Sequence, residues 1–233
     1  MVLMTFAMDR HTSLDMHPYN VARNLFLMNG HRVMSFDLPN HGERVNEFGE
    51  GITGWRNALM QGVDPFIMFI EEGSAAIDMM IEAGLARGGN IVVEGTSRQG
   101  YMAMRLLAAD LRVSAASLYC PVTDWRELQE FEQDAQLDRI AALQLTHYCS
   151  GAEGKPLYIA IGNHDLRVST ISCCKFHLHV TEHYRSRGYD SNFIDFYCTD
   201  DPGHSVDDLW RTKGAEFLLQ HHVISSQNKS RSF

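Results

Sequence analysis

Short apolar runs alternate along this chain with longer segments in which apolar residues recur every three or four positions. The short runs predict buried strands at residues 2–7, 32–37, 90–94, 113–119, 157–161 and 192–198. The longer segments predict helices at residues 19–29, 98–110, 169–187 and 206–220, and two helices within 55–85 that separate near 62–65. Residues 9–18 are polar and predict a loop, whereas the charged, amphipathic segment 124–148 predicts one or two surface helices.

This alternation of strands and helices predicts an α/β fold, a three-layer α/β/α sandwich around a mainly parallel sheet. The sequence has no internal repeat and no Pro/Ser-rich linker, so we expect a single domain over residues 1–222. We also expect a short helical insertion at about 124–154 and a flexible tail at 223–233. If the strands take the order 2-1-3-4-5-6, the order reverses between the first and third strands. Ligand sites in open α/β sheets form at such a reversal, outside the carboxyl ends of the strands.

The third predicted strand stops at Gly95 and is followed by Ser97, just before a predicted helix. A serine on a sharp strand-to-helix turn is typical of a nucleophile elbow, whose strained backbone exposes the hydroxyl at the carboxyl end of a sheet. Gly95 fits because a side chain there would collide with the helix that follows. Elbows usually carry glycine two residues after the serine, but this chain has Gln99 there. We expect Gln99 to pack against the sheet and leave the turn intact; an ordinary strand-to-helix turn is the alternative.

Two further polar stretches follow the last two predicted strands, on the same rim of the sheet as Ser97. The first contains Asp165 and the second contains His204. A serine hydroxyl is a poor nucleophile near neutral pH, so it needs a base within hydrogen-bond reach and a third group that orients the base. Ser97, His204 and Asp165 supply these roles, in the chain order serine, acid, histidine. Taken singly, Asp165 can be a turn residue, and His204 can belong to the loop before a helix.

The composition narrows the classes of function. The chain has 233 residues, of which 45% are apolar, and a formal net charge of −9. That charge argues against nucleic acid and anionic membrane surfaces as partners, since both need clustered Lys and Arg. The five cysteines follow no disulfide spacing, and no run is long enough to span a bilayer, so we expect a cytoplasmic protein with free thiols. The sequence implies no metal and no organic cofactor, and it leaves the oligomeric state open, a homo-oligomer included.

The sequence resembles the α/β-hydrolase superfamily, most closely its dienelactone-hydrolase and prolyl-oligopeptidase-like branches. The resemblance rests on four stretches that fall in the family's order, at residues 37–44, 95–100, 162–168 and 203–204. It implies a minimal α/β-hydrolase fold that lacks the first two strands. It also implies that Ser97 is the nucleophile, Asp165 the acid and His204 the base.

In this family an oxyanion hole would use the N–H of Arg98 and a second N–H from the loop after the first strand. Families usually carry His-Gly in that loop, whereas this chain has Ala7-Met8-Asp9-Arg10-His11. We expect the N–H of Arg10 to be the second donor.

Three further residues are expected at the substrate pocket. Cys120 and Trp125 follow the fourth strand and are expected to line the wall, and His41 lies in a loop that can approach it. Cys120 is the alternative nucleophile, although it has no elbow. The predicted function is a serine hydrolase, a carboxylesterase that cleaves a small-molecule ester through an acyl-enzyme. A peptidase-like acyl hydrolase of the same fold and a non-catalytic hydrolase-like binding protein are the alternatives.

Overall fold

Six parallel strands form one sheet in the order β2-β1-β3-β4-β5-β6. The structure is a computed structural model, and it describes residues 1–221. The strands are β1 (Val2–Phe6), β2 (Arg32–Met34), β3 (Ile91–Thr96), β4 (Val113–Tyr119), β5 (Leu157–Gly162) and β6 (Ile194–Thr199). The order therefore reverses between β1 and β3, as expected. The predicted tail at 223–233, like residue 222, lies outside the described residues.

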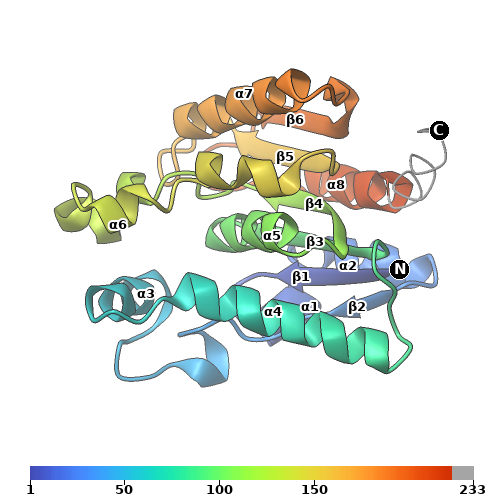
Figure 1. Cartoon of the computed structure of the whole chain (residues 1–233), viewed down its shortest axis with the longest axis horizontal. Helices are drawn as coiled ribbons and strands as arrows, with labels where there is room; N and C mark the ends of the chain where they lie inside the picture. Colours follow the sequence, from blue (N-terminus) through green and yellow to red (C-terminus); the bar gives the residue numbers. More distant parts are fainter. Residues whose placement is uncertain (222–233) are drawn as a thin grey trace.

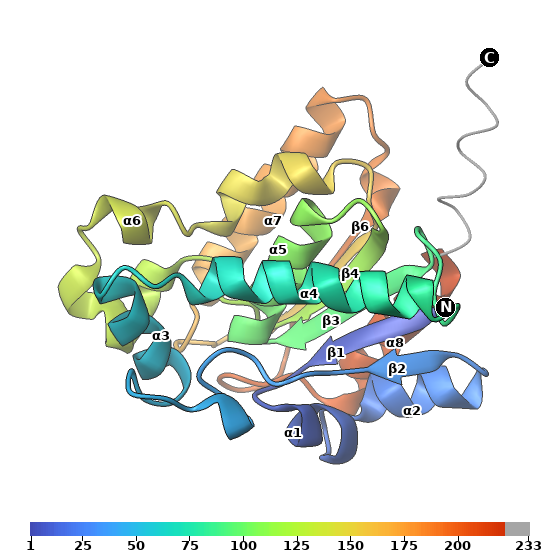
Figure 2. The same cartoon turned by 60° about the horizontal axis from the view of Figure 1, so that its bottom comes forward.

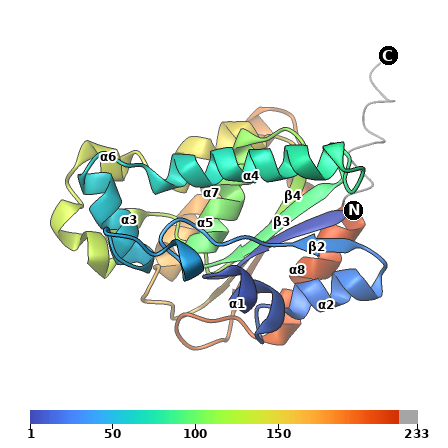
Figure 3. The same cartoon turned by 90° about the horizontal axis from the view of Figure 1, so that it is seen from below.

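Helices cover both faces of this sheet. They are α1 (Arg10–Asp15), α2 (Val21–Met28), α3 (Gly51–Met60), α4 (Pro65–Glu82), α5 (Arg98–Ala109), α6 (Asp138–Ala141), α7 (Thr170–Ser186) and α8 (Asp208–His221). As Figure 1 and Figure 3 show, α2 and α8 lie together on one face, whereas α4, α5 and α7 cover the other. This arrangement confirms the predicted three-layer α/β/α sandwich, with a sheet that is parallel throughout.

The two central strands explain why the apolar runs were easy to recognise. All seven residues of β4 are buried, as are the first five of β3, because helices press on both faces of these strands. The sequence of a strand that is buried on both faces is continuously apolar and does not alternate between apolar and polar residues. The predicted break near 62–65 is also present, since Asp64 accepts from the N–H groups of Phe66 and Ile67 and begins α4 there.

Two connecting segments differ from the predicted elements. Residues 9–18, predicted to be a loop, contain α1, which begins where the Asp9 carboxylate accepts from the Thr12 N–H at 2.9 Å. In place of one or two helices, residues 124–148 form short turns of helix. These are η2 (Trp125–Glu127), η3 (Gln129–Asp134), α6 and the start of η4 (Leu145–Ala152). Figure 2 shows α6 at the same end of the molecule as α3.

The insertion is broken into short pieces because it is anchored to the core at short intervals. Trp125, Phe131, Ile140 and Leu145 are all completely buried. A continuous amphipathic helix would present only one stripe to the core and would leave some of these side chains exposed. No helix in residues 1–221 is both long and apolar enough to cross a membrane.

One carboxyl group is completely enclosed in the sheet, three residues before Ser97. The oxygens of Glu94 accept from the Thr5 hydroxyl at 2.8 Å and from the Tyr119 hydroxyl at 3.3 Å. Burial raises the pKa of Glu94 to about 7, although the hydrogen bond from Thr5 and the charge of Arg211 oppose the increase. Glu94 therefore binds its proton more tightly in the folded state than in the unfolded chain.

We predict that this carboxyl group makes folding pH-dependent. Its contribution to stability is complete below the ordinary carboxyl pKa and is lost as the pH rises through about 7, a change of roughly 2–3 kcal/mol. Glu94→Gln stays neutral and should remove that part of the pH dependence. Urea unfolding of both proteins at about pH 5 and pH 7 measures the difference. Parallel pH profiles for wild type and Glu94→Gln would show that Glu94 is not responsible.

Candidate active site

Ser97 occupies a sharp turn between β3 and α5. Its backbone has φ 62° and ψ −123°, a strained combination for a residue with a side chain. The turn is held because the Ser97 N–H donates to the Tyr119 carbonyl at 2.7 Å and the Val122 N–H donates to the Ser97 carbonyl at 3.1 Å. Gly95 is required, since a Cβ there would lie 2.2 Å from the Gln99 carbonyl oxygen. Ser97 thus has the geometry of a nucleophile elbow.

The Gln99 side chain leaves this turn intact, as expected. Gln99 is only 2% exposed, so it does not cover the site from the solvent side. In the orientation that satisfies both ends of the carboxamide, its nitrogen donates to the Thr96 carbonyl and its oxygen accepts from the Met8 N–H, each at 2.7 Å. Gln99 therefore ties the elbow to the loop after β1. Met8 itself has φ 57°, a left-handed conformation that usually favours glycine.

The structure brings Ser97, His204 and Asp165 together from three loops at the carboxyl ends of strands. The His204 Nε2 lies 2.8 Å from the Ser97 hydroxyl oxygen, and the His204 Nδ1 lies 2.7 Å from Asp165 Oδ2. We assign the imidazole proton to Nδ1, because a carboxylate can only accept; Nε2 is then free to accept from the serine hydroxyl. The Asp165 carboxylate is completely buried, while the His204 side chain is 28% exposed.

Asp165 is held in one orientation by its own loop. Its second oxygen, Oδ1, accepts from the N–H groups of Arg167 at 2.9 Å and Val168 at 3.1 Å. These bonds leave Oδ2 directed at the imidazole. A buried carboxylate held in this orientation can stabilise a positive charge that develops on His204.

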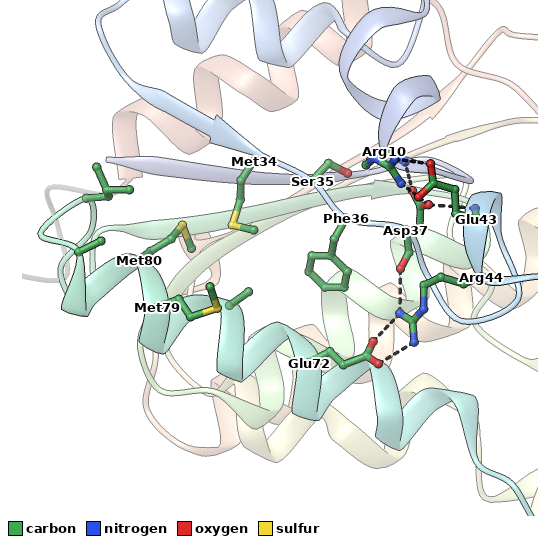
Figure 4. A pocket seen from close by; sticks show the side chains of 13 residues that line it. Arg10, Met34, Ser35, Phe36, Asp37, Glu43, Arg44, Glu72, Met79 and Met80 are labelled. Carbon is green, nitrogen blue, oxygen red and sulfur yellow. Dashed lines mark hydrogen bonds and ion pairs between the residues drawn. The ribbon is translucent and has the colours of Figure 1, made fainter.

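The expected second oxyanion donor, Arg10, is directed elsewhere. Its N–H donates to Asp37 Oδ1 at 2.8 Å, and its guanidinium bonds to Asp37 and Glu43. Figure 4 shows these contacts at one end of a cavity of about 640 Å³ beside β2, which Ser97, Asp165 and His204 do not line. The prediction for Arg10 is therefore wrong. It failed because the acceptor comes from a loop 27 residues away, which no local pattern indicates.

A different N–H group of the same loop, that of Asp9, is available to bind an oxyanion. The Ala7 N–H donates to the Ser13 hydroxyl at 2.7 Å, and the Met8 N–H is taken by Gln99. Within residues 1–221, the Asp9 N–H has no hydrogen-bond acceptor. No sequence pattern indicated that this amide would be free, although Asp is a favoured residue at a helix N-cap.

Three pocket residues were predicted from the sequence, and the prediction for Trp125 is wrong. Its side chain has no exposed surface and packs among aromatic rings, including Phe66 at a centroid distance of 4.9 Å. Trp125 is therefore part of the aromatic core and does not line the wall of a substrate pocket. Cys120 is also buried, but it lies close to the triad: its sulfur and one ligand atom each from Asp165 and His204 all lie within 4.8 Å of one another.

Cys120 is a poor candidate for a nucleophile or a metal ligand. Burial, followed by the charge of Asp165, raises the pKa of Cys120 to about 12, so the thiol keeps its proton at neutral pH. A metal ion bound by Cys120, Asp165 and His204 would require this thiolate and would also displace the proton shared between the other two. The donor set thus fits a hydrogen-bonded pair beside a neutral thiol better than it fits a metal centre.

His41 reaches the site through Arg98. The His41 Nδ1 contacts the Pro39 carbonyl at 2.8 Å, and its Nε2 accepts from Arg98 Nε at 2.9 Å. Burial, reinforced by the nearby Arg98 charge, lowers the pKa of His41 to about 4. His41 is therefore a neutral acceptor at pH 7, and the expected approach of its loop to the site is present.

Solved structures with the same fold include hydrolases from several sources. An esterase of Pyrococcus furiosus superposes with a TM-score of 0.65 at 18% identity, over 95% of this chain and 82% of the esterase. A cold-adapted esterase from an Arctic intertidal metagenomic library gives 0.66 at 18% identity, over 94% of this chain and 81% of that one. A puromycin-hydrolyzing peptidase of Mycobacterium tuberculosis gives 0.65 at 13% identity, over 95% of this chain but 34% of the peptidase.

No protein-family model and no curated protein matches the sequence. The structural likenesses, together with the sheet order and the elbow, show that the chain has the α/β-hydrolase fold.

We predict that Gln99 stabilises the site through its carboxamide. Gln99→Met keeps the shape of the side chain but removes the two hydrogen bonds to the Met8 N–H and the Thr96 carbonyl, which should lower the free energy of unfolding by about 1–3 kcal/mol. Urea unfolding measures this loss, and the exposed Gln133→Met serves as a matched control that should stay within error of wild type. An equal effect of the two substitutions would contradict this role.

Proposed function

We propose that this protein is a serine hydrolase that cleaves a small carboxylic ester through an acyl-enzyme. The observation that carries the proposal is the pair of hydrogen bonds that joins Ser97, His204 and Asp165, at 2.8 and 2.7 Å. The esterase activity of two proteins with this fold supports the proposal, as does the elbow geometry of Ser97. A non-catalytic binding protein would need neither the strained serine nor the oriented imidazole.

The reaction begins when the Ser97 oxygen attacks the ester carbonyl carbon. His204 Nε2 takes the hydroxyl proton as the new C–O bond forms, and Asp165 stabilises the resulting imidazolium without taking the proton itself. When the tetrahedral intermediate collapses, His204 returns the proton to the departing alcohol. Water then attacks the acyl-enzyme by the same route, and Ser97 recovers its proton as the acid leaves.

Two backbone N–H groups stabilise the oxyanion of each tetrahedral intermediate. Arg98 supplies the first, because it opens α5 directly after the nucleophile. Asp9 supplies the second: its N–H is the amide without an acceptor in the described part of the loop after β1, and Gln99 holds that loop against the elbow through Met8. No step of this scheme draws on a metal or an organic cofactor.

The short insertion between β4 and β5 favours small esters over peptides. It consists of η2, η3, α6 and η4, whose apolar residues are packed into the core and leave no separate domain above the pocket. A peptide bond has a harder leaving group and needs binding energy from remote contacts to orient it. The puromycin-hydrolyzing peptidase, in contrast, has about two thirds of its chain outside the matched region.

A small-molecule substrate also suits a protein with a net charge of −9, which disfavours nucleic acid and anionic membranes. The five cysteines are all free, in keeping with the reducing cytoplasmic location that we propose.

We predict that Asp165→Asn lowers kcat on short 4-nitrophenyl esters by on the order of 10⁴, since an amide would hold the wrong imidazole tautomer. Asp200→Asn is the matched control, because Asp200 is exposed on the same rim and bonds to no catalytic group within residues 1–221. Steady-state assays of both variants and wild type test the assignment. A large loss in Asp200→Asn with none in Asp165→Asn would identify a different carboxylate.

The substrate class gives a second prediction. Short acyl 4-nitrophenyl esters should be hydrolysed with a kcat/KM at least a hundredfold above that of amino-acyl 4-nitroanilides, roughly 3 kcal/mol in transition-state stabilisation. Both product colours can be followed in parallel assays with the same enzyme preparation. Faster cleavage of the anilides would show that the protein is a peptidase and not an esterase, and the assignment of Ser97, His204 and Asp165 would be unaffected.

A further inference from the structure

The side chain of Arg98 has no part in the proposed mechanism, which uses only its backbone N–H. Arg98 follows Ser97 directly in the chain, so its side chain starts next to the nucleophile. The Nε atom donates to His41 Nε2 at 2.9 Å and to the Gln99 carboxamide oxygen at 3.3 Å. Within residues 1–221, the two terminal nitrogens of this guanidinium have no hydrogen-bond or ion-pair partner. A partly exposed cation therefore stands beside the nucleophile with its fork of donors free.

His41 fixes the position of this cation without neutralising it. The His41 Nδ1–H donates to the Pro39 carbonyl, so its Nε2 has a lone pair directed at Arg98. The imidazole is neutral at pH 7, as described above. Gln99 is likewise a neutral acceptor. Arg98 thus differs from Arg10, Arg44, Arg56 and Arg112, each of which is paired with a carboxylate.

A second guanidinium lies on the same rim. Arg167 follows Asp165 by two residues and donates to Glu130 Oε1 at 2.6 Å. After burial, the charge of Arg167 is the largest influence that lowers the pKa of Arg98, so the two cations are close enough to repel each other. Glu130 and Glu50 also attract Arg98, but Glu130 is already bonded to Arg167, and within residues 1–221 Glu50 makes no hydrogen bond or ion pair with Arg98. Among the described residues, the Arg98 guanidinium is therefore a cation on this rim to which no carboxylate is directly bonded.

We propose that this guanidinium is a subsite for a carboxylate carried by the substrate, with its two terminal nitrogens as the ligands. The inference rests on the proposed esterase function and specifies its substrate class: esters that bear one carboxylate besides the scissile group. A planar guanidinium with both terminal nitrogens free matches a carboxylate through two parallel hydrogen bonds. A single guanidinium suits a monoanion, whereas a dianionic phosphate would add repulsion from Glu130 and Glu50.

Matched ester pairs test the subsite. On the acyl side, the 4-nitrophenyl monoesters of glutaric and adipic acid are compared with the neutral 4-nitrophenyl valerate and hexanoate, which have the same chain lengths. On the alcohol side, 4-acetoxybenzoate is compared with its methyl ester. The enzyme-free rate is subtracted, since a neighbouring carboxylate accelerates spontaneous hydrolysis. Wild type should prefer the anionic member of at least one pair by about tenfold or more in kcat/KM, which is the effect of one charge-assisted hydrogen-bond pair.

Substitution of the side chain should then remove this preference. In Arg98→Gln the ratio of anionic to neutral kcat/KM should fall to about one or below, and in Arg98→Lys it should be intermediate, because a lysine keeps the charge without the fork. Arg185→Gln removes an equal charge from an exposed site on α7 and should keep the wild-type ratio. Because each ratio compares two substrates on one protein, a general loss of activity cancels.

Several outcomes would overturn the proposal. One is a wild type with no preference for either anionic ester; another is a preference that persists in Arg98→Gln. Stronger inhibition of neutral-ester turnover by inorganic phosphate than by glutarate would also contradict a carboxylate subsite. Failure of the esterase proposal looks different, since then neither member of any pair is hydrolysed and a neutral fluorophosphonate does not label the protein. Labelling of Arg98→Gln by that probe shows that the variant has folded.

Discussion

The proposed active site depends on one strained residue, Ser97, whose backbone is held in a left-handed conformation at the end of β3. Such a conformation costs about 1–3 kcal/mol for a residue with a side chain and persists only where its surroundings enforce it. Here the next strand enforces it through the Tyr119 carbonyl, and the loop after β4 does so through the Val122 N–H. Gly95 permits the close approach of α5, which a Cβ would block. The elbow therefore exists because β3, β4 and α5 are already in place, and the hydroxyl can meet His204 only when all three are.

Two departures from the usual hydrolase pattern compensate each other at this point. Gln99 stands where a glycine is common, and Ala7-Met8 stands where His-Gly is common. Met8 has a left-handed φ of 57°, a conformation that favours glycine, and its N–H is bonded by the Gln99 carboxamide. The Gln99 side chain on the elbow thus supports a loop that carries no glycine at this strained position. Considered separately, each departure weakens the site; together they form a hydrogen bond between Gln99 and Met8.

The sequence predicted features that depend on local pattern and on the order of strands. The strands were recognisable because central positions such as Val92 and Ala116 are buried on both faces, and Ser97, Asp165 and His204 because each follows a strand on the same rim. Features set by contacts between distant segments were not predictable. The Arg10 amide is bonded by Asp37, and Trp125 is enclosed by rings from α4 and α5. The same limit applies to the Arg98 side chain, which within residues 1–221 bonds to the neutral groups of His41 and Gln99 and to no carboxylate.

The most direct test of the account is to identify the residue that a fluorophosphonate probe modifies. Intact mass spectrometry should show one adduct on the wild-type protein, and peptide mapping should place it on Ser97. The adduct should be absent from Ser97→Ala and strongly slowed in His204→Gln, because the imidazole must remove the hydroxyl proton as the bond to phosphorus forms. An unlabelled wild type, or an adduct that survives in Ser97→Ala, would contradict the assignment of Ser97 as an activated nucleophile.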